Sequence, residues 1–523
     1  MDQLSHRQIM RVLVGLMSGI FLAAVESTIV ATAAPTIVED LGGLSLITWV
    51  FTAYMLTTTV SAALWGKLSD IVGRRSTYLA AISIFVVGSL LAGAAQNMTQ
   101  LLVFRGLQGI GGGGLTSLSF TIMADILAPR RRGRYIGYFS ATFAAGSVFG
   151  PVLGGLLVEW FHWRVVFLIN LPLGLIAALI SSSALRGVGG RRKARLDVAG
   201  ALTLSGAIVC LLLVGVWGGN EYRWGSSEIL GLAVAAVGLL LAFVAIEQRA
   251  SEPVIALRLL RNRTLMLSMV IAALTTIPFN AAVVYLPLFL QVVDGASVSG
   301  SGLRLAPLMV MMSVGSIAAG RRVSKTGRYK LLLYVGLVLG VADVVGLAML
   351  GTGTSTLTVV GLMLLLGLSF GITAPVVNLS AQNAMPLADL GAASSALITF
   401  RSLGATVGIA GVGTVLLSRL RSGIGALPGG STLDVDAIAS GPDTITRLAE
   451  PLRSGVIGAM ADGVARGMAV CLPLVIVALI VAVWLPELPL RDHTEITIGG
   501  GAPDVGRPAD TAGRRASIPS VEG

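Results

Sequence analysis

Long apolar segments dominate the chain and constrain its fold more than any other feature. Segments of roughly 20 apolar residues, each long enough to cross about 30 Å of hydrocarbon as a helix, recur throughout the sequence. Only 12% of the residues are charged, whereas a soluble protein needs about 25% for a solvated surface. Lipid cannot satisfy backbone polar groups, so a spanning chain forms helices or a closed barrel. The segments are too long and too uniformly apolar for barrel strands, which predicts an all-α polytopic membrane protein.

Lysine and arginine mark one side of the predicted bundle. They gather in alternate loops, for example at 130–134 and 191–195, whereas the loops between these carry few. By the positive-inside rule the basic loops are cytoplasmic. An even number of crossings then places both termini in the cytoplasm of a multi-pass protein of the cell (inner or plasma) membrane. Fourteen spanning helices are predicted, over residues 10–34, 46–65, 77–96, 100–126, 136–158, 165–184, 196–217, 228–247, 264–291, 302–320, 330–350, 356–380, 390–418 and 467–486.

The net charge and the cysteines exclude two other classes of protein. A formal charge of +11 could indicate a nucleic-acid-binding protein. The basic residues lie in short loops between apolar segments, so we interpret them as topology signals and expect no nucleic-acid partner. Cys210 and Cys471 both lie in apolar segments and predict neither a disulfide framework nor a metal site.

A weak internal repeat relates two halves of the chain. The segment GKLSDIVGRR at 66–75 recurs in altered form as GRRVSKTGRY at 320–329. The same offset aligns Asp294 with Asp40 and Asn280 with Glu26. Parallel repeats of this kind are typical of large secondary transporters.

The repeat divides the chain into domains. We predict an N-terminal six-helix bundle over 1–185, cytoplasmic linkers with two inserted helices over 186–263, and a C-terminal six-helix bundle over 264–486. Within the last bundle, 419–466 would form a long outer loop of mixed charge. Residues 487–523 are rich in Gly, Pro, Asp and Arg, which predicts a disordered cytoplasmic tail.

Several short motifs carry a family resemblance across nearly the whole chain outside the loop and the tail. The segments concerned are Gly66–Arg75, Glu26–Pro35, Arg105–Gly109, Gly146–Gly155, Trp163-Arg164 with Asn170–Pro172, and Tyr285–Pro287. Together they resemble the major facilitator superfamily, in particular its fourteen-span drug/proton antiporter branch (EmrB/QacA type). The resemblance implies a major facilitator fold of two six-helix bundles plus two linker helices. The chain departs from the family at Glu26, where Asp is usual.

Glu26 is the strongest candidate for proton coupling. A carboxylate inside a membrane helix costs roughly 2.5–3.5 kcal/mol on insertion scales and is therefore retained for a use. Protons and substrate would compete for it, which gives exchange. Arg105 is its expected partner, at a similar depth in the fourth helix. The alternatives are a structural ion pair between helices for Glu26 and an arginine that binds backbone carbonyls for Arg105.

The first basic loop resembles a gate. By resemblance it would hold the two halves together in the outward-facing state, with Asp70 capping a helix N-terminus and the arginines pairing with acids. Topology charge alone would explain the arginines but not Asp70 or the glycines. The gating residues are Gly66, Asp70, Gly73, Arg74, Arg75 and Asp125.

Three further polar residues lie within the apolar segments of the second half. Asp343 would bind a cation or a second proton, or else line a water-filled crevice without a role. Arg401 resembles a family arginine, and Asn280 is the repeat counterpart of Glu26. With Glu26, these residues are the candidates for the substrate cavity.

Glycine-rich stretches in this chain indicate helix packing. Gly146, Gly150 and Gly154 recur every fourth residue and present a small face to a neighbouring helix, and Pro151 permits a bend. The segment 109–114 matches G-x-G-x-x-G only formally, because no strand precedes it. A G-x-x-x-x-G-K-[ST] motif is also absent from the sequence, so we expect no cofactor and an ion gradient as the energy source.

We therefore expect a monomeric, proton-coupled exporter of amphipathic, cationic compounds rather than an enzyme, with the lipid bilayer, protons and a small substrate as its partners. The first alternative is an exporter of one endogenous lipid or metabolite. A proton-pumping respiratory subunit would need charges chained through the membrane, whereas all four lysines, Lys67, Lys193, Lys325 and Lys330, lie in loops or at helix ends. A non-transporting sensor on the same scaffold is a third alternative.

Overall fold

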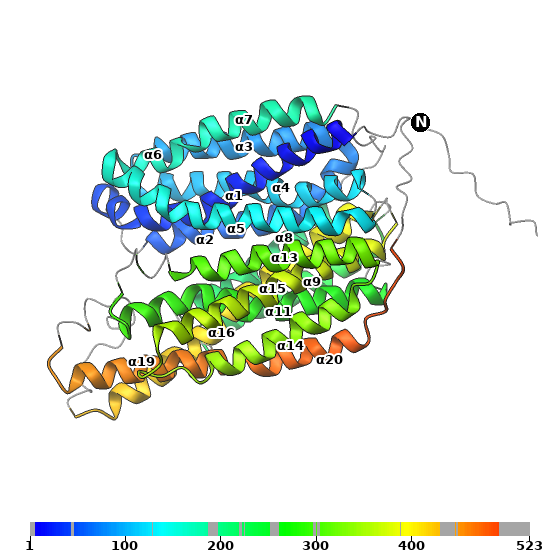
Figure 1. Cartoon of the computed structure of the whole chain (residues 1–523). Coiled ribbons are helices and arrows are strands. Elements are labelled where there is room, and N and C mark those ends of the chain that lie inside the picture. The colour runs from blue at the N-terminus through cyan, green and yellow to red at the C-terminus, as the bar shows by residue number, and fades with distance from the viewer. Residues whose placement is uncertain are drawn as a thin grey trace, which may run out of the picture.

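The computed structural model describes residues 6–42, 46–127, 129–186, 197–218, 222–223, 225–250, 261–296, 300, 304–386, 389–428, 445 and 448–490. Within these ranges the chain is helical, and its β-structure is limited to an isolated bridge between Gly218 and Tyr222. Figure 1 shows the helices running side by side, with α1 to α7 in one group and α11 to α20 in another.

In the described part of the chain, nine helices form the first half and the hairpin that follows it. They are α1 (His6–Leu41), α2 (Ile47–Val72), α3 (Arg74–Gly93), α4 (Met98–Ile126), α5 (Pro129–Trp160), α6 (Trp163–Leu168), α7 (Asn170–Ala184), α8 (Val198–Trp217) and α9 (Ser227–Glu247).

Seven named helices lie within the described residues of the second half. They are α11 (Arg263–Val292), α13 (Ala306–Thr326), α14 (Lys330–Leu347), α15 (Thr356–Asn383), α16 (Leu390–Gly425), α19 (Leu452–Ala469) and α20 (Cys471–Val483). Each of the fourteen predicted segments coincides with helix in the structure, although several helices extend beyond the predicted ends.

Among the described residues, eleven spans are long and apolar enough to cross a membrane, with the segments Trp163–Ala184 and Leu452–Val483 each counted as one. Helices α2, α4 and α13 are not among them. These three pack inside the structure, α2 and α13 against α4 and α15, respectively. Their sequences are rich in Gly, Ser and Thr, which lower hydropathy and allow close approach between helices.

The outer loop predicted at 419–466 is much shorter in the structure. Helix α16 continues to Gly425, and α19 begins at Leu452, inside the predicted loop. On α19 the buried residues Val456, Met460, Val464 and Met468 recur every fourth position and form an apolar stripe. The part of the loop between 429 and 444 lies outside the described residues.

The predicted tail also begins in an ordered way. The Glu487 carboxylate accepts a hydrogen bond from the backbone N–H of Tyr329 at 3.0 Å, and the Tyr329 hydroxyl donates to the Pro486 carbonyl at 3.0 Å. The Asn383 amide donates to the Pro489 carbonyl at 3.2 Å. Residues 487–490 are therefore held against the bundle, and 491–523 lie outside the described residues.

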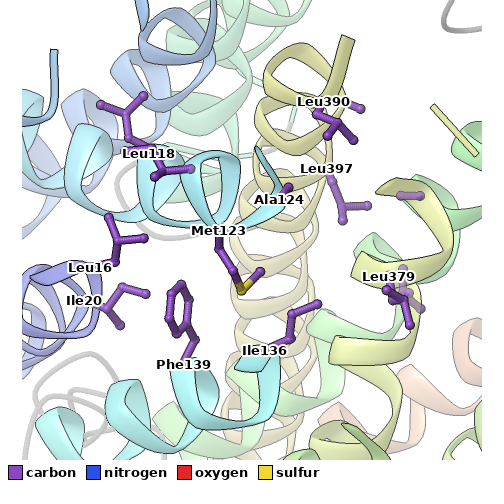
Figure 2. Close-up of a cluster of buried hydrophobic side chains, with 14 of the residues drawn as sticks. Leu16, Ile20, Leu118, Met123, Ala124, Ile136, Phe139, Leu379, Leu390 and Leu397 are labelled. Carbon is purple, nitrogen blue, oxygen red and sulfur yellow. The ribbon is translucent and has the colours of Figure 1, made fainter. Parts of the chain in front are cut away.

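Several contacts between helices join the halves directly, and two of them are the most extensive. Helix α5 packs against α13, and α2 packs against α16. A buried hydrophobic cluster continues across this boundary. In Figure 2, Leu118 and Met123 of α4 and Phe139 of α5 lie in the same cluster as Leu379 of α15 and Leu390 and Leu397 of α16.

The hairpin of α8 and α9 lies over the line where the halves meet. Leu204, Ile208 and Leu212 of α8 form a small buried cluster that packs against α2 and against Leu403 of α16. The outer face of α9 exposes large apolar side chains such as Val234 and Leu241. An apolar face of this kind suits lipid rather than water.

The internal repeat recurs in the backbone. Gly73 separates α2 from α3 with φ of 102°, and Gly327 ends α13 before α14 with φ of 69°. Both positions lie in a conformation that favours glycine because it has no Cβ. Since the repeat aligns these two glycines, a glycine with positive φ occurs at the matching position of each half.

Candidate functional site

The centre of the candidate site is a buried ion pair between α1 and α4. Glu26 and Arg105 have 0% and 1% of their surface exposed, and the Arg105 guanidinium donates to the Glu26 carboxylate. The amide of Asn170, at the start of α7, donates to the other oxygen of the same carboxylate. The structure therefore brings together the two residues that the sequence predicted as partners and adds a third.

The ion pair is part of a larger polar network. Arg105 Nη1 donates to Gln108 Oε1 at 2.6 Å, and Gln108 Nε2 donates to Ser89 Oγ at 3.0 Å. Asn170 Nδ2 also donates to Ser89 Oγ, at 2.9 Å, and Ser89 itself donates to the carbonyl of Phe167 at 2.8 Å. Side chains from α1, α3, α4 and α7 thus converge on one point.

An aromatic ring covers the arginine. The guanidinium carbon of Arg105 lies 4.2 Å from the centroid of the Tyr54 ring of α2, which is a cation–π distance. Glycines make this approach possible, because a Cβ at Gly112 would lie 2.8 Å from the Tyr54 hydroxyl oxygen. Within the described residues, Arg105 Nε and Asn170 Oδ1 have no hydrogen-bond partner.

This arrangement neutralises a carboxylate inside the membrane. A buried ion pair is strongly destabilised when only one partner is removed, because the other charge is then uncompensated. Protonation of Glu26 has the same electrostatic effect as removing its charge. The network can therefore couple the protonation of one carboxyl group to the position of a guanidinium on another helix.

The gating loop forms a second cluster at the junction of α2, α3 and α4. Arg74 pairs with Asp70 at 2.6 Å and with Asp125 at 2.6 Å. It also donates to the Ser69 hydroxyl, which in turn donates to the Gly66 carbonyl at 2.7 Å. Arg75 points elsewhere, to the Ser182 carbonyl at the end of α7, at 2.9 Å.

The capping role expected for Asp70 is not found. The N-cap position of α3 is Gly73, and that cap has no side-chain hydrogen bond. Asp70 instead faces Arg74, because the turn at Gly73 directs the arginine back toward the last turn of α2. The carboxylate also lies at the boundary of the halves, since a Cβ at Gly391 of α16 would be 3.5 Å from Asp70 Oδ2.

At the opposite end of the bundle, a matching pair of acids holds neighbouring segments together. Asp40 accepts hydrogen bonds from Arg164 at 2.7 Å and from the Trp163 indole at 2.9 Å. These hydrogen bonds hold the pKa of the Asp40 carboxyl below its usual value. Its repeat counterpart, Asp294, accepts from Arg304 at 3.3 Å and from Thr356 at 2.8 Å.

The candidates of the second half do not join the Glu26 network. Asn280 donates to the Thr276 carbonyl of its own helix at 3.0 Å. The Arg401 guanidinium lies 5.9 Å from the centroid of Phe370, which stacks on Phe279 with centroids 4.1 Å apart. Asp343 is fully buried in α14, and its carboxyl group has no hydrogen-bond partner within the described residues.

The glycines of α5 face α1. A Cβ at Gly146 would lie 2.7 Å from the Ala24 Cβ, one at Gly150 would lie 2.9 Å from the Val25 carbonyl oxygen, and one at Gly154 would lie 2.8 Å from the Ile29 carbonyl oxygen. Pro151 lies inside the same helix. The glycine face therefore sets the position of the turn of α1 that carries Glu26.

Four residues of the site were not predicted from the sequence, namely Asn170, Gln108, Ser89 and Tyr54. Gln108 follows Arg105 by three positions and so shares its helix face, which was an available signal. Asn170 and Ser89 come from other helices, and their convergence depends on the tertiary structure. Among the described residues, no group of three or more His, Cys, Asp or Glu side chains could hold a metal ion.

A bundle of apolar helices with buried ion pairs is the architecture of a membrane transporter. The family model of the Major Facilitator Superfamily matches residues 16–409. The chain belongs to this superfamily. It is therefore a multi-pass membrane transporter of small substrates, and not an enzyme.

Relatives and solved structures agree with this assignment. Multidrug transporter protein MdtP of Bacillus subtilis is 38% identical over 406 residues, which cover 77% of this chain and 75% of that protein. Multidrug resistance protein 3 of the same organism is 30% identical over 499 residues, or 93% of this chain and 97% of that protein. The proton:xylose symporter XylE shares the fold with a TM-score of 0.62 at 14% identity, over 92% of this chain and 96% of that chain.

Proposed function

We propose that the chain is a proton-coupled antiporter that exports amphipathic, cationic compounds by alternating access. The observation that carries the proposal is the Glu26–Arg105 pair, a fully buried acid whose charge is balanced by one arginine on another helix. Relatives named as multidrug transporters support export of drug-like compounds.

Proton and substrate would compete for the Glu26 carboxylate. Deprotonated Glu26 pairs with Arg105 and accepts from Asn170. A proton from the outer side neutralises Glu26 and releases the guanidinium, which is still held by Gln108 and covered by Tyr54. A cationic substrate from the inner side would replace that proton, so that each binding event drives the other out.

The gating cluster would hold the halves together between these events. Arg74 joins α2, α3 and α4 through Asp70 and Asp125, next to the start of α16. Breaking this cluster would allow α16 to separate from α2, which opens the cytoplasmic side. The substitution Asp70→Asn should therefore reduce turnover more than substrate affinity.

The same proposal includes the finer assignment of the chain. We place it in the fourteen-span drug/proton antiporter branch, with α2, α4 and α13 crossing the membrane in addition to the eleven apolar spans. It would work as a monomer in the cell membrane, with both termini in the cytoplasm and without a cofactor.

The test is ethidium flux in everted vesicles under an imposed proton gradient. Wild type should accumulate the dye only with the gradient, and Glu26→Gln should abolish accumulation while protein remains in the membrane. Asp462→Asn is the matched control, because it makes the same chemical change at an exposed acid of α19 that pairs with Arg466. Absence of dye flux in wild type would favour an exporter of one endogenous lipid or metabolite.

A further inference from the structure

Asp343 is a second fully buried acid, and it takes no part in the hydrogen-bond network of Glu26. It lies on α14, with 0% of its surface exposed. Gly336, Gly340 and Leu347 share its helix face, and all are buried. This face packs on α15, where Ser369 donates to the Gly336 carbonyl at 2.8 Å, and a Cβ at Gly340 would lie 3.5 Å from Val475 of α20.

Neither carboxyl oxygen of Asp343 has a hydrogen-bond partner within the described part of the chain. Its helix carries two other ionisable groups, and both are turned away from it. Lys330 donates to the Val483 carbonyl at 3.0 Å, and the Tyr334 hydroxyl donates to the Ala482 carbonyl at 3.5 Å.

The helices packed against α14 bring no charge to Asp343. Helix α15 has no ionisable side chain, and α20 has only the Cys471 thiol. The ionisable groups of α19 and α11 lie on exposed surface or bind elsewhere, as the Tyr285 hydroxyl does with the Ile409 carbonyl at 2.8 Å. The remaining groups on these two helices are Arg453, Asp462, Arg466 and Arg263, all exposed.

An ionised carboxylate in this place would have lost its hydration without any compensation. The cost of such a transfer is so large that a buried acid takes up a proton instead. A protonated acid without partners still loses its hydrogen bonds with water, and this loss destabilises the folded state. This uncompensated cost points to a use of Asp343 in transport.

A small cavity lies one helical turn from Asp343, beside Gly340 on the same face of α14. Its volume is about 10 Å³, and Gly340 and the hydroxyl-bearing residues Thr275, Ser369 and Thr373 line it. This volume is about what one water molecule requires. The ring of Phe370 closes another side of the cavity, below the Arg401 guanidinium.

We propose that Asp343 is a second proton-binding site of the transporter, in the C-terminal half and independent of Glu26. The proton enters from water on one side of the membrane through the hydroxyl-lined cavity, binds a carboxyl oxygen and leaves to water on the other side. In the conformation described here Asp343 is protonated, whereas Glu26 is ionised beside Arg105. The inference rests on the proposed function only for its link to substrate flux.

The first experiment detects the proton itself, without transport. The full chain in lipid nanodiscs is examined by infrared difference spectroscopy between acidic and alkaline buffer. Wild type should show the carbonyl stretch of a protonated carboxylic acid at neutral pH, and Asp343→Asn should remove that band while Glu26→Gln leaves it in place. A band that persists in both Asp343→Asn and Asp343→Leu would overturn the proposal.

The second experiment measures coupling in proteoliposomes. The membrane potential and pH gradient at which net substrate flux reverses give the number of protons exchanged per substrate. Asp343→Asn should lower this number by one and still transport, whereas Glu26→Gln should stop coupled flux. An unchanged number with the infrared band lost would also overturn the proposal. If wild type shows no proton-coupled flux, the proposed function fails, and the infrared result still decides whether Asp343 is protonated.

Discussion

Glu26 and Asp343 are both fully buried acids in membrane helices, one in each half of the molecule, yet their surroundings are opposite. Glu26 accepts from Arg105 and Asn170, and its arginine is held by Gln108. Asp343 has no hydrogen-bond partner in the described part of the chain. Burial alone therefore does not determine the charge of an acid, because compensation by neighbouring groups decides it.

The largest expected effect comes from removing the compensation. Arg105→Leu leaves Glu26 buried without its counter-charge, and we expect the free energy of unfolding to fall by about 3–5 kcal/mol. Thermal unfolding in detergent measures this. Arg401→Leu is the matched control, since no salt bridge of the described residues includes Arg401, and it should have a much smaller effect. Equal losses of unfolding free energy in the two variants would mean that the Glu26–Arg105 pair contributes no more to stability than Arg401 does.

Replacing each of the two acids by leucine should change the free energy of unfolding in opposite directions. Asp343→Leu replaces a polar group without partners by an apolar side chain and should raise the free energy of unfolding by about 2 kcal/mol. Glu26→Leu should lower it, because Arg105 is then uncompensated. Denaturant titration of both variants in the same detergent makes the comparison. A loss of stability in Asp343→Leu would show that the acid has a structural role.

Two serines extend the comparison to neutral groups. Ser89→Ala removes the acceptor shared by Gln108 and Asn170 and should cost about 1 kcal/mol, with a decrease in dye efflux. Ser369→Ala removes only a bond to a helix carbonyl that already lies in its own helical ladder, so it should cost less. The expected order of the two losses would be reversed if the cavity beside α14 were the more tightly bonded region.

The smallest effect concerns an exposed acid. Because Arg164 and Trp163 hold the pKa of the Asp40 carboxyl below its ordinary value of 3.8, these bonds contribute stability above that pH. This stability is lost as the pH falls through the folded-state pKa. Asp40→Asn should remove this acid-side decrease from the pH profile of the unfolding temperature. Asp462→Asn is the control, and an identical change there would show that the decrease arises elsewhere.

The sequence predicted the helices well and the site only in part, for a physical reason. Apolar length is local information, so all fourteen segments coincide with helices. Glu26, Arg105 and Arg74 were recognisable as charges in or near membrane segments. Ser89 and Asn170 were not recognisable, because nothing in the neighbouring sequence distinguishes a functional hydroxyl or amide near a helix end. Their role depends on the convergence of four helices.

Helix α19 shows where a signal was present and missed. Glycines, two arginines and Asp462 interrupt its apolar run, which favoured a loop over 419–466. The four-residue spacing of Val456, Met460, Val464 and Met468 nevertheless indicates a helix with one buried face. Similarly, Asp343 was visible as an intramembrane acid, but its isolation is a property of α15 and α20 rather than of its own segment.

The ordered start of the C-terminal segment has a practical consequence for anyone who attaches a reporter to this protein. Glu487 accepts from the backbone N–H groups of Tyr329 and Lys330, at 3.0 and 3.4 Å, and so closes the first turn of α14, the helix that carries Asp343. A fluorescent or affinity tag fused directly after Leu485 would delete this closure. Fusion beyond Leu490 keeps it, together with the Asn383 bond to Pro489.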